Sequence, residues 1–269
     1  MKLTAEDCKE ERISREKIER QETAGRIRLS PRLKAVADFV PAGVWAADIG
    51  TDHGYIPIYL VETGKVPGAL AMDVGKGPLE RARAHVQAME PELREKIELR
   101  LSDGLGGMKA GEAGTVVIAG MGGELMIRIM AQGRHVWESV DTWVLSPQSE
   151  LEEVRQFLFR EGFVILKEQM VKDSGKFYTV MAAGRGKMAP MAEEERRYGP
   201  CLIRDKSPVL LEYLDQEEKR IRGIRESFDP EKEEQWTPGQ KKAFLQMGEE
   251  LALIEGTRKR MRDKEEDIK

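Results

Sequence analysis

The sequence predicts an α/β fold: a mostly parallel sheet that ends in an antiparallel hairpin, followed by a C-terminal helical hairpin of coiled-coil type. Short apolar runs alternate with helix-like segments from residue 30 to residue 160, which is typical of parallel strands joined by helices. Two strand-like runs with a turn signal between them then predict the hairpin. We expect three parts: a charged extension at 1–29, an α/β domain at 30–187 and a helical coiled-coil domain at 188–269.

Composition excludes several classes of protein. The 269 residues carry a net charge of -4, whereas nucleic-acid binders are usually basic overall. A polyanion could bind only at a local patch of basic residues. No apolar run approaches the length of a membrane helix, and the N-terminus is too charged for a signal peptide. The 3 histidines and the distant Cys8 and Cys201 form no metal-binding cluster. We therefore expect a cytoplasmic protein without a metal or a membrane segment.

Charged residues dominate 1–29, for which we expect a solvated helical extension. Near its end, Arg26, Arg28 and Arg32 lie close together in the sequence and are candidate contacts to RNA. A solvated helix face is the alternative interpretation of these arginines. A serine and a proline at 30–31 predict the start of a helix, because serine caps helix N-termini and proline suits the first helical position.

The first strand is predicted at 43–47, which is apolar on both faces as a central parallel strand must be. In the turn that follows, Gly50 lets the backbone pass close to a ligand. A dinucleotide fingerprint would need further glycines where Asp52 and Tyr55 stand, so that motif is absent. Asp48 and Asp52 place two carboxylates where a pyrophosphate would lie, and this arrangement favours a cationic ligand.

A second acid, Asp73, closes the next apolar run, at 69–73. Acids at the ends of two consecutive strands resemble the S-adenosylmethionine site of class I methyltransferases, in which the second acid binds the ribose hydroxyls. Helix caps or turn residues are the alternative interpretation of Asp48 and Asp73, since acids are common after strands. The glycine turn beside Asp48 favours cofactor binding.

The third and fourth strands are predicted at 97–101 and 115–119. Asp103 follows the third strand and is the candidate contact to the adenine amino group of the cofactor, although a turn-forming Asp-Gly would look the same. Three glycines at 120–123 follow the fourth strand and allow close approach of a ligand, with a glycine-rich turn before a helix as the alternative. The Asn/Asp-Pro-Pro-aromatic motif of enzymes that methylate exocyclic amines is absent here, which favours a ring nitrogen as methyl acceptor.

The fifth strand is predicted at 142–145, a helix at 150–160, and the hairpin strands at 163–171 and 176–183. A terminal hairpin beside parallel strands distinguishes the methyltransferase fold from the dehydrogenase fold. Beyond it, helix starts near Ser207 and Thr237, the second with a capping-box pattern, precede two apolar stripes of heptad-compatible spacing. The stripes are Leu210, Leu214, Ile221, Ile224 and Phe228, then Phe244, Met247, Leu251, Ile254 and Met261. Such a hairpin suits an arm that grips a large substrate or partner, with homodimerisation as the alternative.

Together these residues resemble the bacterial tRNA (adenine-22-N1)-methyltransferase family, TrmK. The most specific matches are the Asp-Ile-Gly-Thr-Asp-His-Gly-Tyr-Ile-Pro stretch at 48–57 and Gly-Met-Gly-Gly at 120–123, with further matches at 30–33, Asp73, 102–104, 177–178 and 198–200. The resemblance covers residues 30 to 269. It implies a class I methyltransferase that uses S-adenosylmethionine to methylate N1 of adenine 22 in tRNA, on an unpaired or flipped base. Ser146-Pro147-Gln148 stands where the family tends to show Leu-Gln-Pro.

The strand-end motifs and the resemblance together define the candidate site. Candidate cofactor-binding residues are Asp48, Gly50, Thr51, Asp52, His53, Gly54, Asp73, Val74, Ser102, Asp103, Gly104, Gly120, Met121 and Gly122. Candidate substrate-binding residues are Arg26, Arg28, Arg32, Met121, Gly123 and Tyr178. Asp52, and secondarily Glu124, are candidates to stabilise the positive charge that the methylated ring gains, and Tyr55 to stack on the base or cofactor.

Purely structural roles are the alternative interpretation of some of these side chains. Tyr55 and Tyr178 can equally be core aromatics with a solvated hydroxyl, and His53 can simply hold its turn. Two other functions fit the same cofactor motifs: methylation of another RNA or a small molecule, and a scaffold that binds S-adenosylmethionine without catalysis. A small-molecule enzyme would not need the long C-terminal hairpin.

Overall fold

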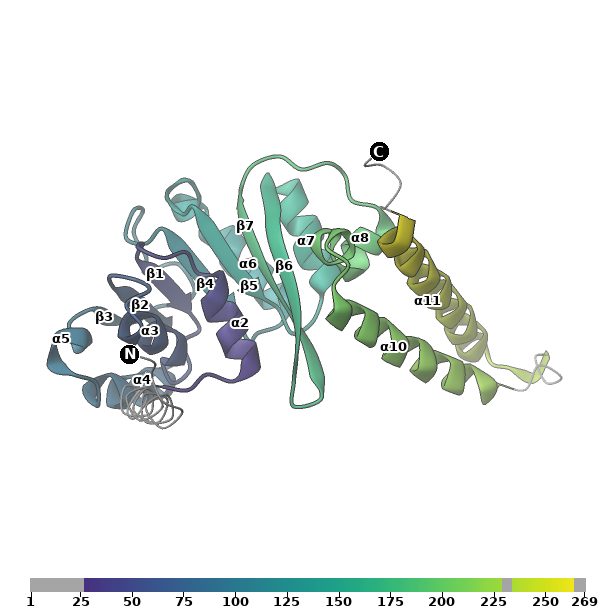
Figure 1. Ribbon diagram of the computed structural model, residues 1–269, viewed down its shortest axis with the longest axis horizontal. Coiled ribbons are helices and arrows are strands. Elements are labelled where there is room, and N and C mark those ends of the chain that lie inside the picture. The colour runs from purple at the N-terminus through teal and green to yellow at the C-terminus, as the bar shows by residue number, and fades with distance from the viewer. Residues whose placement is uncertain (1–26, 229–233, 264–269) are drawn as a thin grey trace, which may run out of the picture.

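The computed structural model describes residues 27–228 and 234–263. A central sheet carries helices on both faces, and two long helices project from its far edge (Figure 1). Most of the expected N-terminal extension, including Arg26, lies outside the described residues. Within the described ranges, no helix is both long and apolar enough to cross a membrane.

Seven strands form one sheet in the order β3-β2-β1-β4-β5-β7-β6. β1 to β5 are parallel, whereas β7 runs antiparallel to β5 and forms a hairpin with β6. The strands are β1 (Ala46–Ile49), β2 (Ala69–Asp73), β3 (Ile97–Leu101), β4 (Thr115–Ala119), β5 (Thr142–Ser146), β6 (Phe163–Asp173) and β7 (Lys176–Arg185). This topology confirms the predicted fold, and it places the carboxyl ends of β1, β2 and β4 along one edge.

Two apolar layers hold the helices to the sheet. One face packs against α2 (Pro31–Phe39), α3 (Tyr55–Glu62) and α4 (Lys76–Gln87), and the other against α6 (Gly123–Gln132), the 3-10 helix η1 (Arg134–Ser139) and α7 (Leu151–Arg160). The one-turn α5 (Pro91–Arg94) precedes β3. α2 begins as predicted, because Ser30 Oγ accepts a hydrogen bond from the Leu33 amide at 3.4 Å.

The first strand starts later than the prediction of 43–47. β1 begins at Ala46, and Trp45 before it is 39% exposed. Trp45 lies over Gly68, where a Cβ would stand only 2.4 Å from the indole ring. The apolar run therefore includes a residue that covers the neighbouring turn rather than the sheet. As a consequence Asp48 lies inside the buried strand, where a carboxylate is expensive to ionise.

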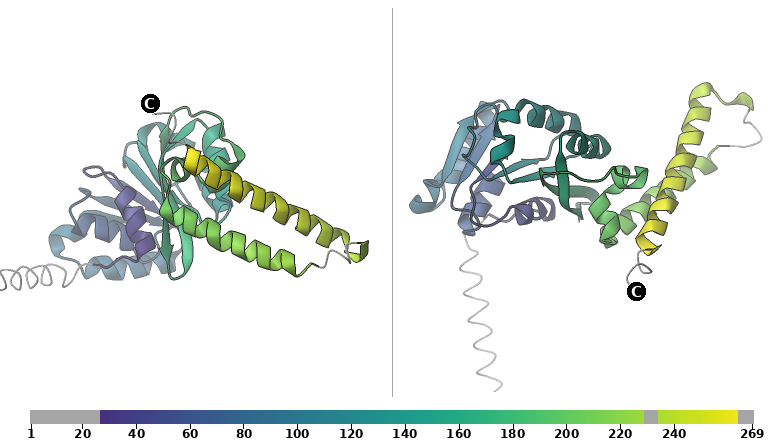
Figure 2. Two further views of the ribbon diagram at one scale, coloured as in Figure 1. Left: turned by 45° about the vertical axis from the view of Figure 1, so that its right-hand side comes forward. Right: turned by 90° about the horizontal axis from the view of Figure 1, so that it is seen from above.

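The C-terminal helices form two pairs. α8 (Glu193–Tyr198) and α9 (Pro200–Arg204) pack against α7 and β6, whereas α10 (Pro208–Glu226) and α11 (Pro238–Asp263) form an antiparallel pair that projects from the sheet (Figure 2). The predicted capping box of α11 is confirmed: the Thr237 amide donates to Gln240 Oε1 at 2.8 Å, and the Gln240 amide donates to Thr237 Oγ1 at 3.2 Å. The domain division at 187/188 and homodimerisation through α10 and α11 stay predictions.

Most of the predicted stripe forms the seam between α10 and α11. Leu210, Leu214 and Ile221 are buried with Ile254 and Met261 of the facing helix. Ile224 is 41% exposed, so its placement in the seam was wrong. Toward the tip of the pair, the seam gives way to an aromatic cluster of Phe228, Trp236 and Phe244.

A buried ion pair fastens the shorter helices to the sheet. Arg155 Nε of α7 donates to Glu168 Oε1 of β6 at 2.9 Å, and both side chains are 0% exposed. Arg155 Nη1 also donates to the carbonyls of Arg196 and Arg197 at the end of α8. Glu168 Oε2 accepts from the Cys201 amide in the first turn of α9 at 2.9 Å. This charged pair thus provides hydrogen-bond partners for the free carbonyls at the end of α8 and for a free amide at the start of α9.

Candidate active site

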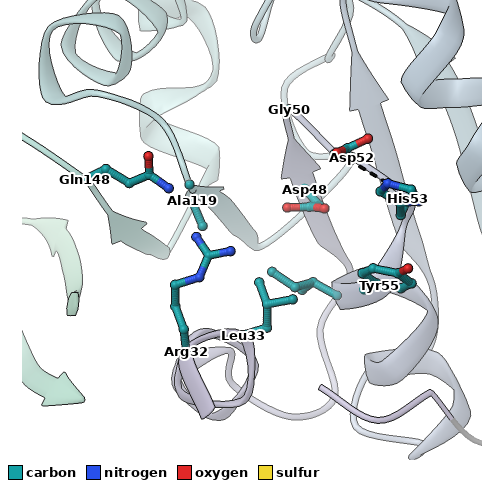
Figure 3. A pocket seen from close by; sticks show the side chains of 11 residues that line it. Arg32, Leu33, Asp48, Gly50, Asp52, His53, Tyr55, Ala119 and Gln148 are labelled. Carbon is teal, nitrogen blue, oxygen red and sulfur yellow. Dashed lines mark ion pairs between the residues drawn. The ribbon is translucent and has the colours of Figure 1, made fainter. Parts of the chain in front are cut away.

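A cavity of about 270 Å³ opens at the carboxyl edge of the sheet, as Figure 3 shows. Its wall combines residues of α2, the turn after β1 and the ends of β4 and β5. Of the predicted residues, the cavity is lined by Arg32, Asp48, Gly50, Asp52, His53, Tyr55 and Gly120. The structure therefore brings together motifs that are separated by up to 88 positions along the chain, from Arg32 to Gly120.

The turn after β1 is held against β2. The amides of Gly50 and Thr51 both donate to the Met72 carbonyl, at 2.8 and 2.9 Å. Gly50 has a φ of +80°, and a Cβ there would lie 2.8 Å from the Met121 methyl group. This position favours glycine because of its backbone angle, whereas the Met121 methyl group is the end of a flexible side chain that can shift. The turn brings its backbone to the floor of the cavity.

Asp48 is the buried acid of this site. It is 8% exposed, and its burial raises the pKa of the carboxyl from 3.8 to about 6, with the Asp73 carboxylate adding to the rise. The nearby Thr51 hydroxyl opposes this rise in pKa, although its geometry is outside that of a normal hydrogen bond. Thr51 Oγ1 is buried and has no other partner among the described residues. A cation in the cavity would stabilise the ionised form of Asp48 and so lower this pKa.

Asp52 is paired with a neighbouring cation. Its Oδ1 accepts from Arg81 of α4 at 2.6 and 3.2 Å, and its Oδ2 lies 3.6 Å from His53 Nε2. The carboxylate is exposed, so this ion pair is weak but still shares its charge. Sequence periodicity gave no sign of Arg81, which faces the turn only because α4 packs beside α3.

Three rings gather at the start of α3. His53, Tyr55 and His85 have centroids 5.2 to 5.7 Å apart, with planes within 24° of parallel. His53 has a φ of +65°, an unusual backbone angle for a side-chain residue, and its carbonyl contacts His85 Nδ1 at 2.8 Å. His85 therefore supports the turn as well as lying on the helix surface. Gly54, with φ of +68°, serves close packing instead, because a Cβ there would meet Ala82 at 3.2 Å.

The acids that follow β2 and β3 lie beside the cavity rather than in its wall. Asp73 Oδ1 accepts from the Gly75 amide at 2.7 Å, while Oδ2 has no hydrogen-bond partner in the described part of the chain. Val74 next to it is 69% exposed, which leaves an apolar surface for a planar ring. Asp103 is exposed at the next strand end. These residues extend the site along the sheet edge toward β3.

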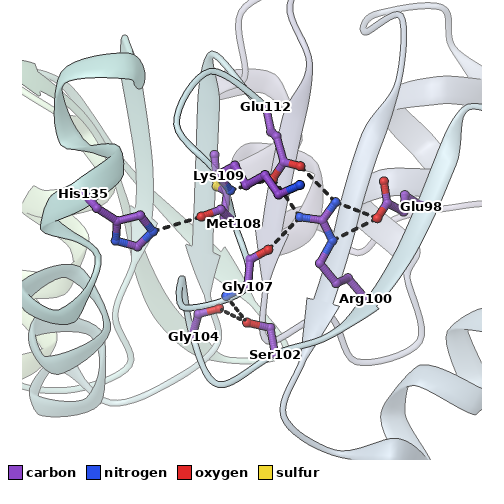
Figure 4. A network of polar contacts seen from close by, with 9 residues as sticks. All are labelled: Glu98, Arg100, Ser102, Gly104, Gly107, Met108, Lys109, Glu112 and His135. Atoms are coloured by element: carbon purple, nitrogen blue, oxygen red, sulfur yellow. Dashed lines mark hydrogen bonds and ion pairs between the residues drawn. The ribbon is translucent and has the colours of Figure 1, made fainter.

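A polar network shapes the turn after β3 (Figure 4). Ser102 Oγ donates to the Gly104 carbonyl at 3.0 Å and accepts from the Gly107 amide at 2.8 Å. Arg100 donates to the Gly107 carbonyl at 2.7 Å and pairs with Glu112. The Ser102 hydroxyl is therefore occupied by its own loop, and its amide donates to the Asp73 carbonyl at 2.9 Å. Gly104 packs against Ile129, where a Cβ would lie at 3.2 Å, and its predicted contact to the cofactor stays a prediction.

The glycine loop after β4 is held by Ser149 and Glu150, which precede α7. Gly123 leaves no room for a side chain, since a Cβ would lie 2.7 Å from the Ser149 carbonyl. Its amide donates to Glu150 Oε2 at 3.0 Å, so Glu150 satisfies the start of α6. Glu124 is exposed on the first turn of α6 and lies outside the cavity wall. The catalytic role predicted for Glu124 stays a prediction.

Of the predicted substrate residues, Arg32 and Tyr178 lie together. The Arg32 guanidinium stands 5.1 Å from the centre of the Tyr178 ring and has no ion-pair partner within the described ranges. It points into the cavity toward Gln148 (Figure 3). Arg28 is exposed before α2 and outside the cavity wall. Gln148 was missed as a site residue, although its departure from the family pattern had marked this loop.

Comparison with known proteins identifies the family. A methyltransferase domain model matches residues 29–181. The tRNA (adenine(22)-N(1))-methyltransferase of Bacillus subtilis (strain 168) is 32% identical over 213 residues, which cover 75% of this chain and 86% of that protein. The chain belongs to the tRNA (adenine(22)-N(1))-methyltransferase family.

Solved structures of this family agree with the fold. The crystal structure of the B. subtilis m1A22 tRNA methyltransferase TrmK has a TM-score of 0.73 at 30% identity, and the match covers 86% of this chain and 98% of that chain. Sp1610 of Streptococcus pneumoniae, a candidate tRNA (m1A22) methyltransferase in complex with S-adenosyl-L-methionine, has a TM-score of 0.74 at 30% identity over 86% of this chain and 99% of that chain. These structural matches therefore extend over more of the chain than the methyltransferase domain at 29–181.

Asp73→Ala is expected to weaken S-adenosylmethionine binding 10- to 100-fold, because a charged acceptor of ligand hydroxyls is worth about 1.5–3 kcal/mol. Asp73→Asn is the matched control: it keeps an oxygen for the Gly75 amide and should lose less affinity. Isothermal titration of the cofactor measures both variants. Unchanged affinity in Asp73→Ala would remove this residue from the site.

Proposed function

We propose that this protein transfers the methyl group of S-adenosylmethionine to N1 of adenine 22 in tRNA, as the name of its B. subtilis relative describes. The observation that carries the proposal is the cavity beside β1 and β4, which joins a buried Asp48 to the backbone of Gly50 and Gly120 in a chain of this family. Asp48 suits a cationic ligand, and both glycines have φ of +80° beside the cavity. These features fit the positively charged methionine end of the cofactor.

Different residues along the sheet edge would bind different parts of the cofactor. Asp48 faces its charged end, and Asp73 Oδ2 is available to the ribose hydroxyls. Val74 supplies an apolar surface for the adenine ring, and Asp103 an acceptor for its amino group. S-adenosylmethionine supplies a methyl group on a positively charged sulfur, so transfer depends on alignment with the acceptor more than on further activation.

The methyl acceptor needs no general base. The N1 lone pair of adenine forms the new bond to carbon, the carbon–sulfur electron pair returns to sulfur, and no proton leaves. The methylated ring gains a positive charge, which Asp52 at the cavity wall would stabilise with the charge that it shares with Arg81. Tyr55 offers a ring for stacking in the same wall.

Two side chains of the opposite wall present the base. The Gln148 amide can accept a hydrogen bond from the exocyclic amine of adenine, a pairing that also serves adenine recognition in nucleic-acid complexes. Arg32, supported by the Tyr178 ring, has donors available for the RNA backbone beside the base. The adenine must leave any pairing or stacking to enter, at a cost of a few kcal/mol.

Incubation of the protein with an unmodified tRNA transcript and labelled S-adenosylmethionine is expected to place one methyl group on N1 of adenine 22. Nuclease digestion and mass mapping of the product identify the base and the ring position. A transcript with guanine at position 22 is the control and should accept no label. No incorporation by protein that binds the cofactor normally would contradict the proposal and favour a scaffold role. Methylation of a different base would contradict the substrate position.

A further inference from the structure

A second cavity, of about 290 Å³, lies between the β6–β7 hairpin and the C-terminal helices. Its wall includes Phe177 of β7, Tyr198 of α8 and Tyr213 of α10, so it exists only because the helices close over the sheet. Gln148 lines both this cavity and the candidate active site. The two cavities are therefore neighbours, and we call the second one the aromatic cavity.

The aromatic cavity offers ring surfaces. Phe177 and Tyr213 meet edge to face with centroids 5.3 Å apart, and Tyr198 lies 6.4 Å from Tyr213. The Tyr198 hydroxyl is already used, since it donates to Glu250 at 2.7 Å. Phe177 and Tyr213 are half-buried, so part of each ring remains accessible from the cavity side. A flat apolar ligand would gain stacking and edge contacts here.

Arg155 adds an unsatisfied donor to the same wall. Its Nε and Nη1 bond to Glu168 and to the end of α8, but Nη2 is buried and has no partner among the described residues. Buried N–H groups are nearly always paired, and leaving one unpaired costs about 1–3 kcal/mol. Because the Arg155 side chain is 0% exposed, a ligand oxygen or ring nitrogen would satisfy the Nη2 group only after a small shift of this wall.

The charges around the cavity argue against a phosphate. Arg155 is balanced by Glu168, and Arg197 is balanced by Glu250 at 3.1 Å. Glu150 and Glu153 add two exposed carboxylates to the wall. A phosphate would therefore meet negative charge without an unpaired cation. Beside the aromatic rings, these carboxylates favour a flat ring that carries N–H donors.

We propose that the aromatic cavity binds a nucleobase of the tRNA that flanks the methylated adenine. This proposal rests on the proposed function. A base supplies a ring for Phe177 and Tyr213, an acceptor for Arg155 and donors for the carboxylates. The cavity volume lies at the lower limit of ligand sites, which suits a single base or nucleoside. The shared Gln148 allows neighbouring nucleotides to occupy the two cavities.

A double-mutant cycle tests this assignment. Tyr213→Leu keeps the apolar packing of α10 but removes the ring, and it is combined with tRNA transcripts that lack the base on one side or the other of the target adenine. Base stacking on an aromatic is worth about 1–3 kcal/mol, so Tyr213→Leu should weaken tRNA binding about 5- to 100-fold. One abasic transcript should show the same loss with the wild-type protein, and the two changes together should cost little more than either alone.

Control variants and folding measurements complete the design. Tyr213→Phe keeps the ring and should bind tRNA within twofold of wild type, and Phe244→Leu is an aromatic control outside the cavity. Cofactor affinity and thermal unfolding verify that each variant is folded, and Phe177→Leu replaces Tyr213→Leu if that variant is not. The assignment would be overturned if the loss caused by Tyr213→Leu multiplied with the loss caused by the missing base at both flanking positions. It would also be overturned if neither Tyr213→Leu nor Phe177→Leu weakened tRNA binding. Wild-type methylation of the intact transcript is measured alongside, so failure of the proposed function would be seen separately.

Discussion

Arg155→Met is expected to lower the free energy of unfolding by about 3–5 kcal/mol, because it leaves the Glu168 carboxylate buried without its partner. The same change removes the donors that satisfy the carbonyls at the end of α8. Since α8 and α9 connect the sheet to the projecting helices, their protection from amide hydrogen exchange should fall with the stability. Urea unfolding and hydrogen exchange measure the two effects.

The double variant Arg155→Met with Glu168→Gln is the matched control. It removes both charges, and the glutamine oxygen can still accept from the Cys201 amide. Replacing a whole buried pair by neutral groups is often close to neutral, so this variant should regain at least half of the lost stability. A double variant as unstable as Arg155→Met would show that the ion pair is not the reason for the loss.

Asp48→Asn is expected to raise the free energy of unfolding at pH 7 by about 1–3 kcal/mol and to weaken S-adenosylmethionine binding at least tenfold. The folded-state pKa of Asp48, about 6, lies above its ordinary value of 3.8, so ionised Asp48 opposes folding by about 3 kcal/mol at neutral pH. The asparagine amide needs partners of its own and recovers only part of this. Thermal unfolding without ligand, and cofactor titration, give the two results.

The pH dependence separates this effect from a simple packing change. Protonated Asp48 favours the folded state, so its contribution to stability is complete below pH 3.8, falls as the pH rises toward about 6, and is lost above it. The advantage of Asp48→Asn should therefore shrink between pH 7 and pH 5. Wild-type affinity for the cofactor should rise as the pH increases from 5 to 7, because Asp48 becomes ionised, and it should level off above pH 7. Asp38→Asn, an exposed acid on α2, is the control and should change neither property.

Local patterns predicted much of the fold because they act over a few residues. The acids after β1 and β2, the glycine turns, the two-strand hairpin and the caps of α2 and α11 each depend on neighbours within one turn or one strand. The class of the sheet followed from them, since parallel strands need helical crossovers and a hairpin needs only a tight turn. The start of β1 was misplaced because hydrophobicity does not distinguish a core residue from Trp45, which covers Gly68.

By itself, the sequence determined where the strands end and which side chains stand at those ends, and this was enough to indicate a cofactor site. Only the tertiary structure decided how those side chains behave. Burial set the pKa of Asp48, the packing of α4 paired Arg81 with Asp52, and the closure of α8 and α10 over β7 created the aromatic cavity. The physical reason is that charge, solvation and cavity shape depend on atoms close in space, whereas periodicity reports only on neighbours in the chain.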